Sequence, residues 1–239
     1  MKLSLIIPCY NESTHITESV KELLFCLRNA TFEFEILFID DGSSDDTRDK
    51  LTSIRGVDNR IRVIFNDYNL GRGSTVAKGF RLSAANVVGF VDIDLSTQAI
   101  YIPYLTQLIL DDIADVATCN RSYKIQLSVF HKIFVRYALS YGYRYFSRWY
   151  LGHGLRDTET GFKFFRREAI IPLLDQVEDT HWFWDTEIMV LAKNSCLRIN
   201  EVDSIFIRRP QKPSTVKIAR DVFCYLHNIF KFKRRMYRR

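Results

Sequence analysis

Four short apolar segments lie in the first part of the chain, and each ends near a polar or acidic residue. The segments are LSLIIP at 3–8, EILFID at 35–40, IRVIF at 61–65 and NVVGFVD at 86–92. They are rich in β-branched or aromatic residues and are separated by intervals long enough for a helix, so the pattern predicts β-α-β alternation. Because they are almost continuously apolar, we expect strands covered on both faces, as in a mostly parallel central sheet with helices on both faces. The predicted fold class is α/β.

The sequence changes character near Arg121. Residues 128–149 form a helical stretch rich in aromatic and basic residues, and the glycine-containing turn LGHGLRDTETGF follows it. No linker or internal repeat separates this part from the first, so we expect a single domain. The expected boundaries are 1–207 for the domain, with halves at 1–120 and 121–207, and 208–239 for a C-terminal appendage.

The formal net charge of +6 is a property of the C-terminus. Residues 208–239 hold 11 of the 34 Lys and Arg residues but one of the 28 acids, so residues 1–207 carry a net charge of −4. Ahead of KFKRRMYRR, apolar residues recur at helical spacing: Ile218, Val222, Tyr225, Leu226 and Ile229. A basic amphipathic helix of this kind suits an anionic membrane surface, although a helix that packs its apolar side on the domain has the same pattern. A nucleic-acid partner is not expected, because no known nucleic-acid-binding pattern accompanies the charge.

Several other classes of protein do not fit the sequence. The longest uncharged stretch, residues 95–110, is too short and too polar for a membrane span, and the N-terminus is typical of a buried strand rather than a signal peptide, which favours a cytoplasmic location. The five cysteines contain no CxxC pair and the five histidines no HxxxH or HExxH spacing. Carboxylates are therefore the expected metal ligands.

Acidic residues follow two of the predicted strands. In parallel sheets, ligands bind beyond the carboxyl ends of the strands, where Asp41 and the pair Asp92 and Asp94 fall. The i, i+2 spacing of Asp92 and Asp94 places both carboxylates on one side, where they can share a divalent cation with phosphate oxygens. Two exposed loop aspartates are the alternative for this common pattern, and the strand end favours the metal site.

Residues beside the other strand ends complete a predicted nucleotide site. After the first strand, the ring of Tyr10 and the carboxylate of Glu12 can hold a base and ribose. After the second strand, Asp41 can accept a hydrogen bond from a base N–H, although the residues at 43–45 also suit a helix N-cap. The loop NLGRGSTVAKG after the third strand combines close backbone approach with positive charge. The expected nucleotide-binding residues are Pro8, Tyr10, Glu12, Asp41, Gly71, Arg72, Lys78 and Asp92.

These segments resemble, in order and spacing, the family 2 glycosyltransferases of GT-A (Rossmann-like) fold, and within them the dolichyl-phosphate mannose or glucose synthase-like branch. The segments are LSLIIPCYNE, EILFIDDGSSDDT, NLGRGSTVAKGF, GFVDIDLS, LRDTETGFKFFRREAI and EVDSIFIRR. The resemblance implies a single catalytic domain that moves a hexose from a UDP- or GDP-sugar to a polyprenyl (dolichyl-type) phosphate. It also implies that Asp92 and Asp94 hold Mg²⁺ or Mn²⁺ on the donor diphosphate, and that Asp157, Thr158 and residues 161–163 lie near the reacting sugar.

The helical stretch at 128–149 gives a further indication about the acceptor. Basic or hydroxyl side chains recur every four residues beside an aromatic stripe: Lys132, Arg136, Ser140, Arg144 and Arg148, with Phe130, Phe134, Tyr137, Tyr141 and Tyr145. The pattern predicts either a groove for a lipid phosphate or an ordinary surface helix with a solvated basic side and a core-facing aromatic side. The resemblance implies that Arg121, Arg136 and Ser140 bind the acceptor phosphate. Catalytic roles are expected for Asp157, Asp94 and Arg121.

Two features of the sequence leave alternatives open. Ser96 replaces the Gln that often follows the DxD pair in dolichyl-phosphate mannose synthases, and Asp185 and Glu187 suit either the acceptor or a helix N-terminus. We expect an inverting, metal-dependent enzyme, peripheral on the cytosolic face of a membrane. The alternatives are a family 2 transferase with a sugar-hydroxyl acceptor in surface polysaccharide synthesis, with Asp157 or Asp185 as base, and an inactive nucleotide-sugar-binding membrane adaptor.

Overall fold

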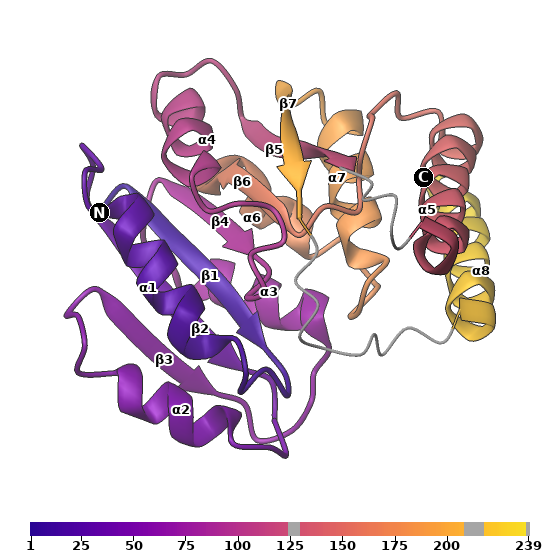
Figure 1. Ribbon diagram of the computed structural model, residues 1–239. Coiled ribbons are helices and arrows are strands. Elements are labelled where there is room, and N and C mark those ends of the chain that lie inside the picture. The colour runs from indigo at the N-terminus through magenta and orange to yellow at the C-terminus, as the bar shows by residue number, and fades with distance from the viewer. Residues whose placement is uncertain (124–129, 208–217, 238–239) are drawn as a thin grey trace.

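The computed structural model describes residues 1–123, 130–207 and 218–237, and within them it contains a seven-stranded mixed sheet with helices on both faces (Figure 1). Side chains are described for residues 1–122, 139–207 and 224–237. The elements of the first half are β1 Leu3–Cys9, α1 Ile16–Leu27, β2 Phe34–Asp40, α2 Thr47–Ile54, β3 Ile61–Phe65, α3 Arg72–Leu82 and β4 Val87–Val91. All four predicted strands are thus confirmed, and they pair in parallel.

The part of the chain after β4 adds three strands to the same sheet. Its elements are α4 Tyr101–Leu110, β5 Val116–Tyr123, α5 Phe130–Leu151, β6 Phe162–Arg166, α6 Arg167–Leu174, α7 Trp184–Asn194, β7 Ile199–Phe206 and α8 Ile218–Met236. The strand order is β3-β2-β1-β4-β6-β5-β7, in which β6 runs antiparallel to both of its neighbours and the other pairs are parallel. The predicted α/β class with a mostly parallel sheet is therefore confirmed.

This topology brings distant loops to one edge of the sheet. The carboxyl ends of β1, β2, β4 and β5 lie at the same edge, and the reversed β6 begins there. At this edge Val91 pairs with Phe162, and the backbone N–H of Asp92 donates to the carbonyl of Gly161 at 3.0 Å. The segment after β4 and the segment before β6 are consequently neighbours, although they are far apart in sequence.

Side chains on both faces of the sheet are buried, as the apolar segments predict. Along β1, Leu5 and Ile7 pack with residues of α1, α2 and α4, while Ile6 packs with residues of α3, α6 and α7. Each of these three side chains is fully buried, and each such burial contributes about 1.5–3 kcal/mol. A rigid sheet with two covered faces therefore supports the loops at its edge.

Helices α5 and α8 run side by side at the end of the molecule far from β3 (Figure 1). Ile229 and Phe232 of α8 are buried in the hydrophobic cluster that also contains residues of α3, α6 and α7. The apolar side of the C-terminal helix therefore packs on the domain. In the described part of the chain, no helix has both the length and the apolar character that crossing a bilayer requires.

Candidate functional site

The predicted nucleotide loops after β1 and β2 are bound to each other. The backbone N–H of Asn11 donates to Ser43 Oγ at 2.9 Å, and that of Glu12 donates to Thr47 Oγ1 at 2.8 Å. Tyr10, the residue that follows β1, is 47% exposed and available to a ligand. Pro8, in contrast, is a residue of β1 itself. Their contacts to a base or ribose stay predictions.

Asp41 is buried and organises the loop after β3. Its Oδ1 accepts hydrogen bonds from Asn66 Nδ2 and from the backbone N–H of Leu70, both at 2.9 Å, and its Oδ2 accepts one from Gly71 N at 3.0 Å. Lys78 Nζ in turn donates to Asn66 Oδ1 at 2.6 Å. The residues expected at the nucleotide site are therefore linked to one another, and the bond from Asp41 to a base stays a prediction.

Gly71 permits a close approach between the starts of α3 and α7. Its φ is +93°, and a Cβ there would overlap the carbonyl oxygen of Thr180 and lie 2.9 Å from the His181 ring. The backbone N–H of Ser74 donates to the same Thr180 oxygen at 3.1 Å. Only glycine combines this backbone conformation with this contact, and the contact sets the position of the next residue, Arg72.

Arg72 forms the centre of an ion network at the carboxyl end of β4 and the first turn of α7. Its Nε and Nη2 donate to Asp92 Oδ1 at 2.9 and 2.6 Å, and its Nη1 donates to Asp185 Oδ2 at 2.6 Å. Asp185 Oδ1 also accepts from Lys163 Nζ at 2.7 Å. Burial lowers the pKa of Arg72, but Asp185 and Asp92 outweigh that effect and raise it above its ordinary value. The guanidinium is thus held charged between the DxD loop and α7.

The DxD pair has two different environments. Asp94 accepts hydrogen bonds from Ser96, at 3.0 Å from the backbone N–H and 2.9 Å from Oγ, so Ser96 orients this carboxylate. Asp92 is paired with Arg72 and lies against Gly161, where a Cβ would overlap its carboxylate. The contact explains why β6 is preceded by glycine.

The donor set fits a divalent cation that is shared with a substrate. Within the described residues there is no group of three or more His, Cys, Asp or Glu side chains arranged for a metal. Mg²⁺ typically binds one or two carboxylates and completes its octahedron with substrate phosphates and water. Asp92 and Asp94 match that requirement, and with the diphosphate of a nucleotide they could hold Mg²⁺ or Mn²⁺.

Asp157 is fully buried and binds two arginines. Arg121, from β5, donates to its Oδ2 and Oδ1 at 2.7 and 2.9 Å through Nε and Nη2, and Arg144 Nη2 of α5 lies 2.6 Å from Oδ2. Burial raises the pKa of Asp157, but the two arginines outweigh that effect and hold it below its ordinary value. Asp157 is consequently an ionised anchor for two guanidinium groups rather than a free base. We call Arg121, Arg144 and Asp157 the arginine clamp.

Glu159, which the sequence reading did not select, lies beside the arginine clamp. Its carboxylate is 3.6 Å from Arg121 Nη2 and is 18% exposed. Burial raises the pKa of Glu159 to about 7, against the lowering effect of Arg121. The only sequence signal was its position two residues after Asp157 in RDTETGF. It is a carboxyl group that can exchange a proton near neutral pH.

Helix α5 directs one of its basic side chains inward. Arg144 is 8% exposed and binds the buried Asp157, whereas Arg148, Tyr141 and Tyr145 are exposed. Phe146 and Tyr150 of the same helix pack against the core, so the described part of α5 combines features of both alternatives and neither is excluded. Ser140 is partly buried, and the Arg136 side chain lies outside the described residues, so their binding of an acceptor phosphate stays a prediction.

Asp185 and Glu187 begin α7, and both are buried. Asp185 belongs to the Arg72 network, while Glu187 accepts hydrogen bonds from the backbone N–H groups of Glu178 and Asp179 and from Arg235. The position at a helix N-terminus is confirmed, but the principal partners are the side chains of Arg72, Lys163 and Arg235, which are distant in sequence, and backbone N–H groups eight and nine residues before Glu187. Lys163 gave a signal in the sequence as a cation between the phenylalanines of the strand FKFFR.

A family model and several proteins of known name match the sequence of this chain. Residues 4–174 match the family model described as glycosyl transferase family 2. Glycosyltransferase AglD of Haloferax volcanii is 30% identical over 93% of this chain, which spans 35% of AglD. Dolichyl-phosphate beta-glucosyltransferases of Dictyostelium discoideum and Homo sapiens are both 28% identical. They match 97% and 84% of this chain, which spans 77% and 66% of their lengths.

Solved structures confirm the fold. Glucosyl-3-phosphoglycerate synthase from Mycobacterium tuberculosis, in complex with Mg²⁺ and UDP, has a TM-score of 0.69 at 16% identity, with 97% of this chain and 77% of that chain covered. S. aureus TarS in complex with UDP-GlcNAc has a TM-score of 0.60 at 19% identity, with 97% and 66% covered. These neighbours share the GT-A architecture predicted from the sequence.

Proposed function

Because the chain belongs to glycosyl transferase family 2, we propose that it transfers a hexose from a nucleotide-sugar to a polyprenyl (dolichyl-type) phosphate. The names of the dolichyl-phosphate beta-glucosyltransferases support this acceptor and make glucose the first sugar to test. Solved neighbours in complex with UDP support UDP-glucose as the first donor, with GDP-sugars as the alternative. The observation that carries the proposal is the arginine clamp, since two guanidinium groups suit a phosphate acceptor.

On the donor side, the loops after β1 to β4 bind the nucleotide, in the half at residues 1–120. Lys78 and Arg72 add positive charge near the diphosphate, and Asp94, oriented by Ser96, faces it. A divalent cation held by Asp92 and Asp94 would neutralise charge on the leaving diphosphate.

On the acceptor side, in the half at residues 121–207, Arg121 and Arg144 orient the phosphate. One of its anionic oxygens attacks the anomeric carbon from the side opposite the diphosphate. The bond from this carbon to the acceptor oxygen forms as the bond to the diphosphate oxygen breaks, so the nucleoside diphosphate leaves and the configuration inverts. No proton needs to be removed from a phosphate dianion, so Asp157 acts by positioning the two arginines.

The C-terminal region at 208–239 is proposed to attach the enzyme peripherally to an anionic membrane on the cytosolic face. Its described part supports this role through the basic residues in the last turn of α8, Lys233, Arg234 and Arg235. Attachment would bring the enzyme to a lipid acceptor that cannot diffuse through water.

A second candidate function is supported by Glu159. A sugar-hydroxyl acceptor, as in surface polysaccharide synthesis, needs a general base with a pKa near neutrality. The pKa of Glu159, which burial raises to about 7, meets that requirement, whereas Asp157 and Asp185 are engaged in ion pairs with arginine and lysine side chains. Glu159 therefore replaces these two residues as the candidate base for this alternative.

The test is to incubate the purified protein with Mg²⁺ or Mn²⁺, a panel of UDP- and GDP-sugars, and a short polyprenyl phosphate, and to identify products by mass. The proposal predicts a metal-dependent glycosylated lipid phosphate. Transfer only to hydroxyl acceptors would contradict it and select the second function. Nucleotide-sugar binding without turnover on any acceptor would select the inactive adaptor.

A further inference from the structure

The outward faces of α5 and α8 expose several large apolar side chains. Tyr145 and Trp149 of α5 are 77% and 71% exposed, and Phe230 of α8 is 45% exposed. The Phe230 ring lies 5.1 Å from that of Tyr150 and 6.4 Å from that of Phe146, and the latter lies 6.2 Å from Trp149. Trp149 and Phe230 thus belong to one packed cluster that spans both helices, and Tyr145 lies one helical turn before Trp149 on α5.

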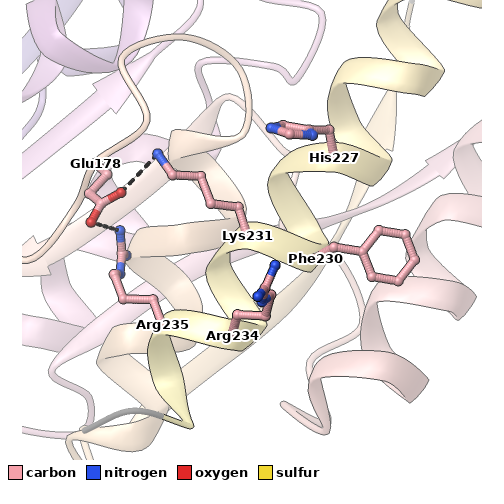
Figure 2. Close-up of a pocket in the computed structure, with 6 residues that line it drawn as sticks. All are labelled: Glu178, His227, Phe230, Lys231, Arg234 and Arg235. Carbon is pink, nitrogen blue, oxygen red and sulfur yellow. Dashed lines mark ion pairs between the residues drawn. The ribbon is translucent and has the colours of Figure 1, made fainter.

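A basic pocket adjoins this cluster. It has a volume of about 460 Å³, and its lining residues are Glu178, His227, Phe230, Lys231, Arg234 and Arg235. Figure 2 shows Lys231 and Arg235 reaching toward Glu178, at 3.0 and 2.8 Å, while Phe230 points away from it. Arg234 and His227 have no ion-pair partner within the described part of the chain. The pocket therefore offers cationic groups beside an aromatic wall.

The positions of residues along α8 place their side chains on three different faces of the helix. Ile229 and Phe232 are buried, at 0% and 2% exposure, and fix the helix to the domain. His227, Lys231 and Arg234 follow the i, i+4, i+7 pattern of a second face, and Phe230 lies on a third, toward α5. Because Ile229 and Phe232 fix α8 to the domain, the exposure of Phe230 is a property of the folded structure. Such exposed apolar patches mark interaction sites.

We propose that this composite surface, the α5–α8 surface of Tyr145, Trp149, Phe230, Lys231 and Arg234, docks on the headgroup layer of an anionic phospholipid membrane. The aromatic rings enter the interfacial region, where amphipathic rings are favoured, and a lipid phosphate occupies the basic pocket. The charges support this partner: the surface is basic, whereas residues 1–207 have a net charge of −4.

The docking surface deepens the peripheral attachment proposed above, and its orientation has a consequence for transfer to a lipid phosphate, a step that rests on the proposed function. Arg144, adjacent to Tyr145 in α5, points inward to Asp157, while Tyr145 points to solvent. A membrane on the outer face of α5 therefore lies one helix thickness from the arginine clamp. A lipid phosphate could reach Arg121 and Arg144 while its chain stays in the bilayer.

The test is flotation of the full-length chain with phosphatidylcholine vesicles, with and without phosphatidylglycerol. The variants Y145S/W149S and K231Q/R234Q remove the rings and the cations separately. The controls are I100S/Y104S, which changes two exposed side chains at the N-terminal end of α4, and K193Q, which changes an exposed lysine on α7. Urea unfolding of each variant checks that the fold is kept.

We expect the wild-type protein and both controls to bind anionic vesicles. Y145S/W149S should lose most binding, and K231Q/R234Q should bind about 30-fold more weakly, since a cation near an anionic surface contributes about 1 kcal/mol. Wild-type-like binding by both test variants would overturn the proposal, as would binding to an RNA oligomer but not to vesicles. A separate assay of hexose transfer to a short polyprenyl phosphate, without vesicles, tests the proposed function independently of membrane binding. Vesicle binding without any transfer would refute the proposed function and leave the docking surface intact.

Discussion

At the scale of single residues, Arg72 connects two elements of the candidate site. Its guanidinium binds Asp92 in the DxD loop and Asp185 in α7, residues that lie on opposite sides of the site. Lysine offers one ammonium group instead of a planar set of five donors, so it cannot reproduce both bonds.

We therefore expect R72K to lower kcat/KM for the donor by about tenfold or more, because a bidentate guanidinium contact is lost. Steady-state kinetics with the donor that the product assay identifies is the measurement. R81K is the matched control, since Arg81 pairs with the exposed Asp175 on the surface and such pairs contribute little. Equal loss in both variants, or no loss in R72K, would contradict the role of the network.

Asp94 is expected to face the metal and the diphosphate. D94N keeps the size of the side chain but removes the charge, so turnover should fall by more than about a hundredfold while the urea unfolding midpoint stays close to that of the wild type. Titration of Mn²⁺ in the presence of UDP provides a second measurement, and it should show weaker metal binding. Near-normal turnover together with normal Mn²⁺ binding would refute the metal assignment.

The folded-state pKa of Glu159 predicts a pH-dependent stability. Its ordinary pKa is 4.5 and burial raises it to about 7. Between these values the folded protein keeps a proton that the unfolded chain has lost, so this residue's contribution to stability falls as the pH rises through that window. E159Q should therefore match the wild type near pH 4.5 and be more stable by up to about 3 kcal/mol near pH 8.

Urea unfolding of E159Q across this pH range tests the prediction, and E168Q, which changes an exposed glutamate of α6, is the control. A stability difference that is constant with pH would show that the Glu159 carboxyl is not shifted.

At the scale of elements, the first turn of α7 links the Arg72 ion network to α8. Asp185 faces Arg72, and two residues later Glu187 accepts hydrogen bonds from the backbone of Glu178 and Asp179 and from Arg235. Carboxylates at this position are also favoured by the helix dipole.

Removing Glu187 would leave the largely buried Arg235 without its interior partner. We expect E187A to lower the free energy of unfolding by about 3 kcal/mol, as is typical for breaking a buried ion pair. Urea denaturation measures this change. D175A, which removes an exposed partner of Arg81, should cost less than about 1 kcal/mol, and an equally small effect of E187A would contradict the assigned role.

The sequence predicted some elements better than others for physical reasons. Strands β1, β2 and β4 are buried on both faces, so their apolar segments are continuous and easy to recognise. The edge strand β3 is only partly buried, with Arg62 exposed, and its segment IRVIF was recognised by its β-branched and aromatic residues. Strand β5 ends in the polar residues NRSY and β7 begins with INEVD, and neither gave a clear apolar signal. Strand β6 contains the buried Lys163, whose charge is compensated by Asp185 from α7.

At the scale of the whole molecule, the site follows from strand direction. The reversal of β6 places residues 157–161 beside the DxD loop, and the parallel β5 delivers Arg121 to the same edge. The sequence could therefore indicate which edge carries the site once the β-α-β alternation was recognised. It could not pair Arg72 with Asp185, or Arg144 with Asp157, because those contacts depend on how α5 and α7 pack.

The central claim is that the arginine clamp binds an acceptor phosphate, and the most direct measurement compares R144Q with the wild type in steady-state transfer to a short polyprenyl phosphate. Arg121 remains on Asp157 in this variant, so the carboxylate keeps a partner. We predict that the KM for the acceptor rises by about tenfold or more while the KM for the nucleotide-sugar is unchanged. An unchanged acceptor KM, or a rise confined to the donor KM, would contradict the account.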